Sequence, residues 1–168
     1  MKLTAIQIGK ILSETTGVSS TTVQTIIRRL GDARLIPRSR RGKKPASIEP
    51  VHAARIVMAV MIAADHFDGT AAAIVDLVPR LEGGSPVGGF SSFGEWLAAA
   101  IENGTNATFF GVTFEKGDIY GWAYEHHIRR SSVAECGLLI GPKFQRSYQF
   151  STCVLETINP LDPREEKR

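Results

Sequence analysis

The sequence predicts an α+β fold, in which a helical N-terminal part and a second helical segment precede a C-terminal antiparallel β-meander. Apolar residues recur at helical spacing over residues 3–34 and again over residues 50–102. Residues 107–158 are instead rich in Phe, Tyr, Val, Thr and Ile, with glycine-containing turns between the apolar runs. The 168-residue chain is 43% hydrophobic and 22% charged, which excludes a disordered chain, a collagen-like repeat and a coiled-coil rod.

The first two predicted helices are short and follow each other closely. The first covers residues 3–14 and ends at Thr15, Thr16 and Gly17. Ser19 or Ser20 can cap the second, which is predicted to run to about Arg34. Its apolar residues share one side of the helix and are Val23, Ile26, Ile27 and Leu30. The second helix is therefore amphipathic, with one side packed and the other polar.

Three more helices and a sheet are predicted from residue 50 onward. The helices cover residues 50–64, residues 69–81 with a disturbance at Pro79, and residues 92–102, where Ser92 and Glu95 have the spacing of a capping box. The helix over residues 50–64 is apolar nearly all round, so it is buried in the chain or shared with a partner subunit. This apolar excess predicts a homo-oligomer, with a dimer favoured; a wholly intramolecular core helix is the alternative. Three or four antiparallel strands are expected after residue 107.

Charge divides the chain into two unequal parts. Residues 1–48 carry a net charge of +8, whereas residues 49–168 carry −5. Such an asymmetry is typical of an N-terminal module that meets phosphates. We therefore expect an N-terminal domain over residues 1–46, an α+β oligomerisation or sensing domain over residues 47–160, and a flexible tail over residues 161–168.

The segment over residues 9–28 resembles the helix-turn-helix family. In that family a sharp turn holds two short helices at a fixed angle, and the second helix enters the major groove of DNA. Gly17 stands at the turn, and the sequence departs from the family at Ser13, where Ala is usual. The apolar residues that would hold the two helices together are Leu12, Val18, Val23 and Ile26. The fold class that follows is an N-terminal helix-turn-helix joined to the α+β remainder.

This resemblance implies that the polar side of the second helix is presented to base edges and phosphates. The residues concerned are Ser19, Ser20, Thr21, Gln24, Thr25 and Arg28. Gln24 suits adenine, Arg28 suits guanine or a phosphate, and the Ser and Thr side chains suit phosphates or thymine. The alternative interpretation is a polar, solvent-facing side of a small helical hairpin.

A dense basic segment adjoins this helix. Eight positive charges fall within 17 residues, against the single acid Asp32, and this density repels itself unless phosphates neutralise it. Pro37 ends the helical pattern, and residues 38–45 are predicted to form a solvated arm or wing that resembles the basic wing of winged-helix regulators of bacteria and bacteriophages. The DNA-binding residues predicted here are Arg29, Arg38, Arg40, Arg41, Lys43 and Lys44. A basic linker that touches the DNA backbone without sequence preference is the alternative.

These observations favour sequence-specific binding of double-stranded DNA by a bacterial or phage transcriptional regulator. One alternative is a DNA-packaging protein resembling the small terminase subunits of phages, and another is a basic module that binds an acidic protein or RNA. A dimer would support the regulator, and a closed ring of about eight or more subunits would support packaging.

Other classes of function find no motif in the sequence. No nucleophile elbow, phosphate-binding loop or zinc-protease pattern occurs, so we expect no enzyme and no cofactor. His126, His127, Cys136 and Cys153 lack the spacing of metal ligands, and we expect no metal site. The longest apolar run, residues 56–64, is about half of a membrane span, and no signal peptide is recognisable. The expected location is the cytoplasm, without membrane contact.

Overall fold

Within its described residues, the computed structural model contains five helices followed by an antiparallel sheet, so the predicted α+β class is confirmed. The structure describes residues 3–38, 47–64, 70–83, 86–87, 89–105, 107–115, 118–127, 130–134 and 147–151, with residues 155 and 158. The helices are α1 (Ala5–Thr16), α2 (Ser20–Asp32), α3 (Pro50–Ala64), α4 (Ala71–Glu82) and α5 (Phe93–Asn103). The strands are β1 (Ala107–Glu115), β2 (Asp118–His127), β3 (Arg130–Ala134) and β4 (Ser147–Ser151).

Side-chain caps set where the helices begin. Thr4 and Gln7 form a complete capping box at the start of α1. The Ser92 hydroxyl accepts the Glu95 amide at the start of α5, as predicted, but the Glu95 carboxylate accepts from the amide and hydroxyl of Ser91 instead of closing the box. Ser19 caps α2, which confirms the predicted start of that helix.

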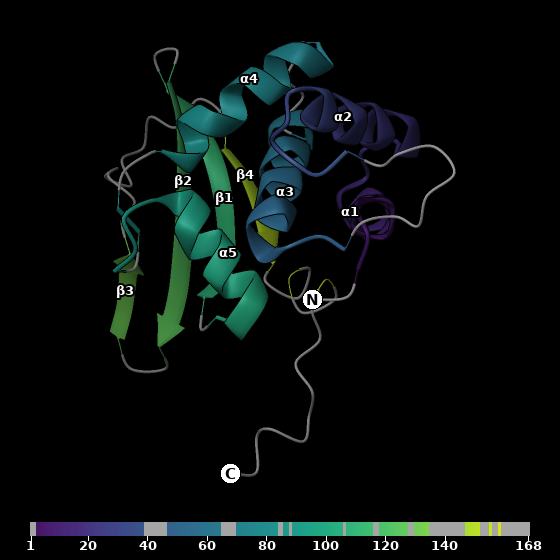
Figure 1. Cartoon of the computed structure of the whole chain (residues 1–168). Helices are drawn as coiled ribbons and strands as arrows, with labels where there is room; N and C mark the ends of the chain where they lie inside the picture. The colour runs from purple at the N-terminus through teal and green to yellow at the C-terminus, as the bar shows by residue number, and fades with distance from the viewer. Residues whose placement is uncertain are drawn as a thin grey trace, which may run out of the picture.

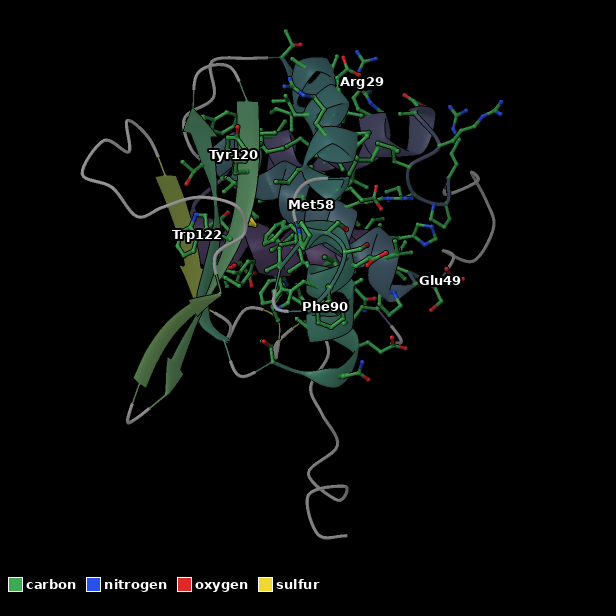
Figure 2. All side chains as sticks on the ribbon, turned by 90° about the vertical axis from the view of Figure 1, so that its left-hand side faces the viewer. Arg29, Glu49, Met58, Phe90, Tyr120 and Trp122 are labelled. Carbon is green, nitrogen blue, oxygen red and sulfur yellow. The ribbon has the colours of Figure 1, made fainter. Side chains whose placement is uncertain are left out.

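Helix α3 is the centre of the molecule. Ten of its fifteen residues are buried, from Ala53 to Ala64, and it contacts α1, α2, α4, α5 and β1. Figure 1 shows α3 between the α1–α2 pair and the sheet, and Figure 2 shows Met58 of α3 in the interior. The apolar surface that suggested self-association is thus covered within the chain, which is the intramolecular alternative; an oligomer stays a prediction.

One continuous core joins the two predicted domains. Buried side chains from Ile8 in α1 to Ile158 near the C-terminus belong to a single hydrophobic cluster, and both α1 and α2 contact α3. The predicted boundary at residue 46 and the tail over residues 161–168 lie outside the described residues. The described residues of both predicted domains therefore share one hydrophobic core, whatever the position of the boundary.

The sheet has the strand order β3-β2-β1-β4, and all its neighbouring strands are antiparallel. Strands β1 to β3 form the predicted meander, but β4 pairs with the other edge of β1, where Phe150 lies opposite Phe110. A simple four-strand meander would leave that edge of β1 unpaired, and the return of β4 covers it. The predicted turn at residues 141–143 lies outside the described residues.

Helix α5 packs against the sheet through an aromatic cluster. Phe93 stacks on Trp96, with 5.6 Å between the ring centroids, and Trp96 contacts Phe110 of β1. The ring of Phe93 lies directly on the backbone of Gly121 in β2, so that a Cβ atom at residue 121 would overlap three of its ring carbons. Glycine at this position brings the helix and the sheet into close contact.

This contact predicts that Gly121→Ala destabilises the protein. The Phe93 ring is rigid and cannot bend away from an added methyl group, so the helix or the strand must shift. We expect this shift to lower the free energy of unfolding by about 1–3 kcal/mol. Urea unfolding followed by circular dichroism measures this cost. Gly31→Ala in α2 is the matched control, because its Cβ would meet nothing closer than 3.9 Å; equal stabilities of the two variants would contradict the proposed packing.

Candidate functional site

The candidate site is the outward side of α2, which a tight turn connects to α1. Gly17 ends α1 with a φ of 74°, a left-handed conformation that favours glycine. The Ser13 hydroxyl donates to the carbonyl of Val18 at 2.8 Å, and the Val18 amide donates to the Thr16 hydroxyl at 3.2 Å. Ser13, at the position where the sequence departs from the helix-turn-helix pattern, is thus bonded to the turn it precedes.

The inward side of α2 packs against the rest of the chain. Val23, Ile26 and Leu30 are buried, as predicted from their spacing. No feature of the sequence marks Gly9 of α1, yet a Cβ atom there would come within 2.6 Å of the Ile27 Cδ1 atom. Gly9 therefore permits the close approach of α1 and α2, a contact visible only in three dimensions.

The structure brings the predicted polar residues of α2 together on the opposite, outward side. They are exposed except for Thr25, which is half-buried: Ser19, Ser20, Thr21, Gln24, Thr25, Arg28 and Arg29. Figure 2 shows the labelled Arg29 at the surface of the molecule. The 3.6-residue period of the helix suffices to align these side chains.

Hydrogen bonds within the helix occupy some of these side chains. The Ser19 hydroxyl caps α2 by accepting from the Thr22 amide at 3.1 Å, and the Thr25 hydroxyl donates to the Thr21 carbonyl at 2.9 Å. Gln24 Nε2 donates a long 3.4 Å bond to the Ser20 hydroxyl. Within the described part of the chain, the side chains of Arg28 and Arg29 have no hydrogen bond or ion pair, so their donors are available to a ligand.

The chain turns sharply after α2. Arg34 has a positive φ of 61°, and the amide of Leu35 donates to the Leu30 carbonyl at 2.9 Å, which closes the helix end. Arg38 then returns to form an ion pair with Asp32 at 3.1 Å. Because 75% of the Arg38 side chain is exposed, this pair is weak and can exchange for a phosphate.

The remaining predicted basic contacts lie outside the described residues; they are Arg40, Arg41, Lys43 and Lys44. Their place relative to α2 is therefore known only from the sequence, which connects them to Arg38 and to Ile48 beside α1. The amide of Ile48 donates to the Leu3 carbonyl at 3.2 Å, so the described residues on either side of this gap, Arg38 and Ile48, lie near the α1–α2 pair.

A groove of about 1090 Å³ runs between α1 and α2, which no feature of the sequence predicts. Its apolar lining includes Gly9 and Ile27, and Ile6, 61% exposed, also lines it. Gln24 and Arg28 line the α2 side of the groove, so a ligand on the outward side of α2 would also meet the groove. The groove results from packing between residues far apart in the sequence, so no local sequence pattern predicts it.

Arg55 of α3 holds the exit from α2 in place. Its Nε and Nη2 atoms donate to the Glu82 carboxylate of α4 at 2.9–3.1 Å, and its Nη1 atom donates to the Leu35 carbonyl at 2.7 Å. Only 23% of the Arg55 side chain and 25% of the Glu82 side chain are exposed. This clamp fixes the backbone just beyond the basic end of α2.

Neither a metal centre nor a membrane span was found among the described residues. In that part of the chain, no three side chains of His, Cys, Asp or Glu gather closely enough to hold an ion, and no helix has the length and apolarity to cross a bilayer. The side chains of His126, His127, Cys136 and Cys153 lie outside the described part. In comparisons with known proteins, no family model, curated protein or solved structure matches the chain.

Because of the bonds in the Arg55 clamp, we expect the contributions of Arg55 and Glu82 to the free energy of unfolding to be strongly coupled. Arg55→Met removes the hydrogen bonds that Arg55 donates to the largely buried Glu82 carboxylate and to the Leu35 carbonyl. We expect this substitution to lower the free energy of unfolding by about 1–3 kcal/mol. The double variant Arg55→Met, Glu82→Met removes both charges and should cost less than the two single variants together. Chemical denaturation of all four proteins measures the coupling.

The matched control is the exposed pair Lys10–Glu14, whose atoms lie 3.9 Å apart and whose coupling should stay below about 0.5 kcal/mol. If the losses of the two single variants simply add in the double variant, the coupling between Arg55 and Glu82 is no larger than at the control pair. That result would show that the clamp does not hold α2.

A second prediction concerns His52, one helical turn before Arg55. Burial lowers its pKa below the ordinary value of 6.5, with Glu49 opposing and Arg55 reinforcing this effect. Its Nδ1 atom is buried, has no hydrogen-bond partner in the described chain, and lies 3.8 Å from the Glu49 carboxylate. Protonation therefore favours the unfolded state.

The stability that neutral His52 contributes is present above pH 6.5 and is lost as the pH falls through the lowered pKa. His52→Gln should show a smaller loss of stability than the wild type between pH 6.5 and the folded pKa of His52. An NMR titration of the imidazole checks the cause, and a His52 pKa at or above 6.5 would contradict it.

Proposed function

We propose that this protein binds double-stranded DNA sequence-specifically, as a bacterial or phage transcriptional regulator of the winged helix-turn-helix kind. The observation that carries the proposal is the two-sided character of α2. Val23, Ile26 and Leu30 are buried while Gln24 and Arg28 face outward. A helix held by one side and open on the other can enter the major groove without unfolding.

The outward residues have the extent of a short DNA site. From Thr21 to Arg28 the helix rises by about 10 Å, or roughly three base-pair steps. Gln24 can donate to and accept from adenine, and the free guanidinium of Arg28 can make a bidentate contact with guanine. Ser19 and Ser20 lie at the N-terminal end of α2, whose first turn has no acidic residue, so backbone amides and hydroxyls there can meet phosphates.

The basic segment supplies the part of the affinity that is independent of sequence. Arg29 lies on the outward side of α2 and the exposed Arg38 pairs with Asp32 at the end of that helix, and residues 40–44 add four more cations. If six basic residues of the region neutralise phosphates, the logarithmic salt slope is about −5 and the affinity falls about a thousandfold between 50 and 200 mM salt. A homodimer would present two copies of α2 to two half-sites.

The proposal predicts that Gln24→Ala and Arg28→Ala alter sequence preference. Selection from a random duplex library defines the site of the wild type, and fluorescence anisotropy then measures each variant on that site and on a scrambled duplex. Each substitution should weaken binding to the selected site by about 1–3 kcal/mol and change the scrambled duplex less.

Arg40→Ala with Arg41→Ala should instead weaken both duplexes alike and flatten the salt slope. Arg80→Ala on α4, a charge-matched change outside both α2 and the basic segment, should leave the preference unchanged. Equal, sequence-blind losses from the α2 and basic-segment variants would favour a basic module for acidic proteins or RNA, and a ring of about eight or more subunits in a solution-mass measurement would favour DNA packaging.

A further inference from the structure

Thr25 differs from its neighbours on the outward side of α2 in what it offers a ligand. Its hydroxyl proton is committed to the Thr21 carbonyl at 2.9 Å, so this side chain does not donate a hydrogen bond outward. It is half-buried while Thr21, Gln24, Arg28 and Arg29 are exposed. What remains for a ligand is its Cγ2 methyl group, together with an acceptor lone pair on the hydroxyl oxygen.

The rotamers of the Thr25 side chain are also restricted. A β-branched side chain in a helix has few χ1 rotamers, and the bond to the carbonyl four residues earlier selects among them. Thr25 lies one helical turn from Thr21 on one side and from Arg29 on the other. Thr25 therefore places a small apolar group between the polar side chains of Thr21 and Arg29 along the candidate reading surface.

Among the four bases, only thymine presents an apolar group in the major groove, its C5-methyl. On the basis of the proposed function, we propose that the Thr25 methyl group contacts the C5-methyl of a thymine and thereby selects thymine at one position of the DNA site. The contact buries two methyl groups against each other and needs no donor, which matches the committed hydroxyl. Thr25 is thus a specificity-determining residue that acts by apolar contact.

Deoxyuridine provides the test, because it differs from thymidine only by the missing C5-methyl. The probe is the duplex that the wild type selects from a random library, with each thymine replaced in turn by deoxyuridine. At one position the replacement should weaken wild-type binding about fourfold, the equivalent of one buried methyl group at ~0.8 kcal/mol. Other thymines should show smaller effects.

Two substitutions at residue 25 separate the methyl group from the hydroxyl group. Thr25→Ser keeps the hydroxyl and removes the methyl, so it should bind the thymine and deoxyuridine duplexes equally. Thr25→Val keeps a methyl group and removes the hydroxyl, so it should retain the fourfold preference. Thr21→Ser is the matched control, because it removes a methyl group one turn away and should leave the preference at this position intact.

Loss of the preference in Thr25→Val with its retention in Thr25→Ser would overturn the inference, because the hydroxyl oxygen would then be the reading group. A selected site without any position at which deoxyuridine weakens binding would overturn it as well. These results leave the proposed function standing. Failure of the wild type to enrich any sequence would overturn the proposed function, and the reading of thymine with it.

Discussion

The burial of α3 is the constraint on which the rest of the structure depends. A fifteen-residue helix with ten buried residues has no side that is polar enough to face water, so other elements must surround it. Helices α1, α2, α4 and α5 and strand β1 do so. The guanidinium of Arg55 is tolerated in this apolar environment because the Glu82 carboxylate and the Leu35 carbonyl accept its hydrogen bonds. The same bonds connect the backbone just after α2 to the core.

This packing determines which side of α2 remains for a ligand. The helix turns Val23, Ile26 and Leu30 inward, and the period of the helix then leaves Gln24 and Arg28 at the surface. The bonded turn at Gly17 and the cap at Ser19 fix where the helix begins, and the Arg55 clamp fixes the chain just beyond its end. The proposed reading surface is therefore rigid at both ends, which suits recognition by shape and hydrogen bonds.

Local features of the fold and the site could be predicted from the sequence, and long-range features could not. The helical period and Ser19 sufficed to predict the start and the two sides of α2, because both act within one turn. The position of β4 beside β1, the contact of Gly9 with Ile27, and the Arg55–Glu82 pair across 27 residues depend on packing between distant segments. The groove between α1 and α2 arises in the same way, and Arg40 to Lys44 remain predictions from charge alone.

Methylation interference on the selected duplex tests most directly whether the outward side of α2 enters the major groove. Methyl groups on guanine N7 obstruct the major groove, whereas those on adenine N3 obstruct the minor groove. We expect guanine N7 methylation to block binding of the wild type, with at least one such guanine losing its influence in Arg28→Ala. Interference confined to adenine N3, or the same pattern in wild type and Arg28→Ala, would contradict a major-groove role for α2.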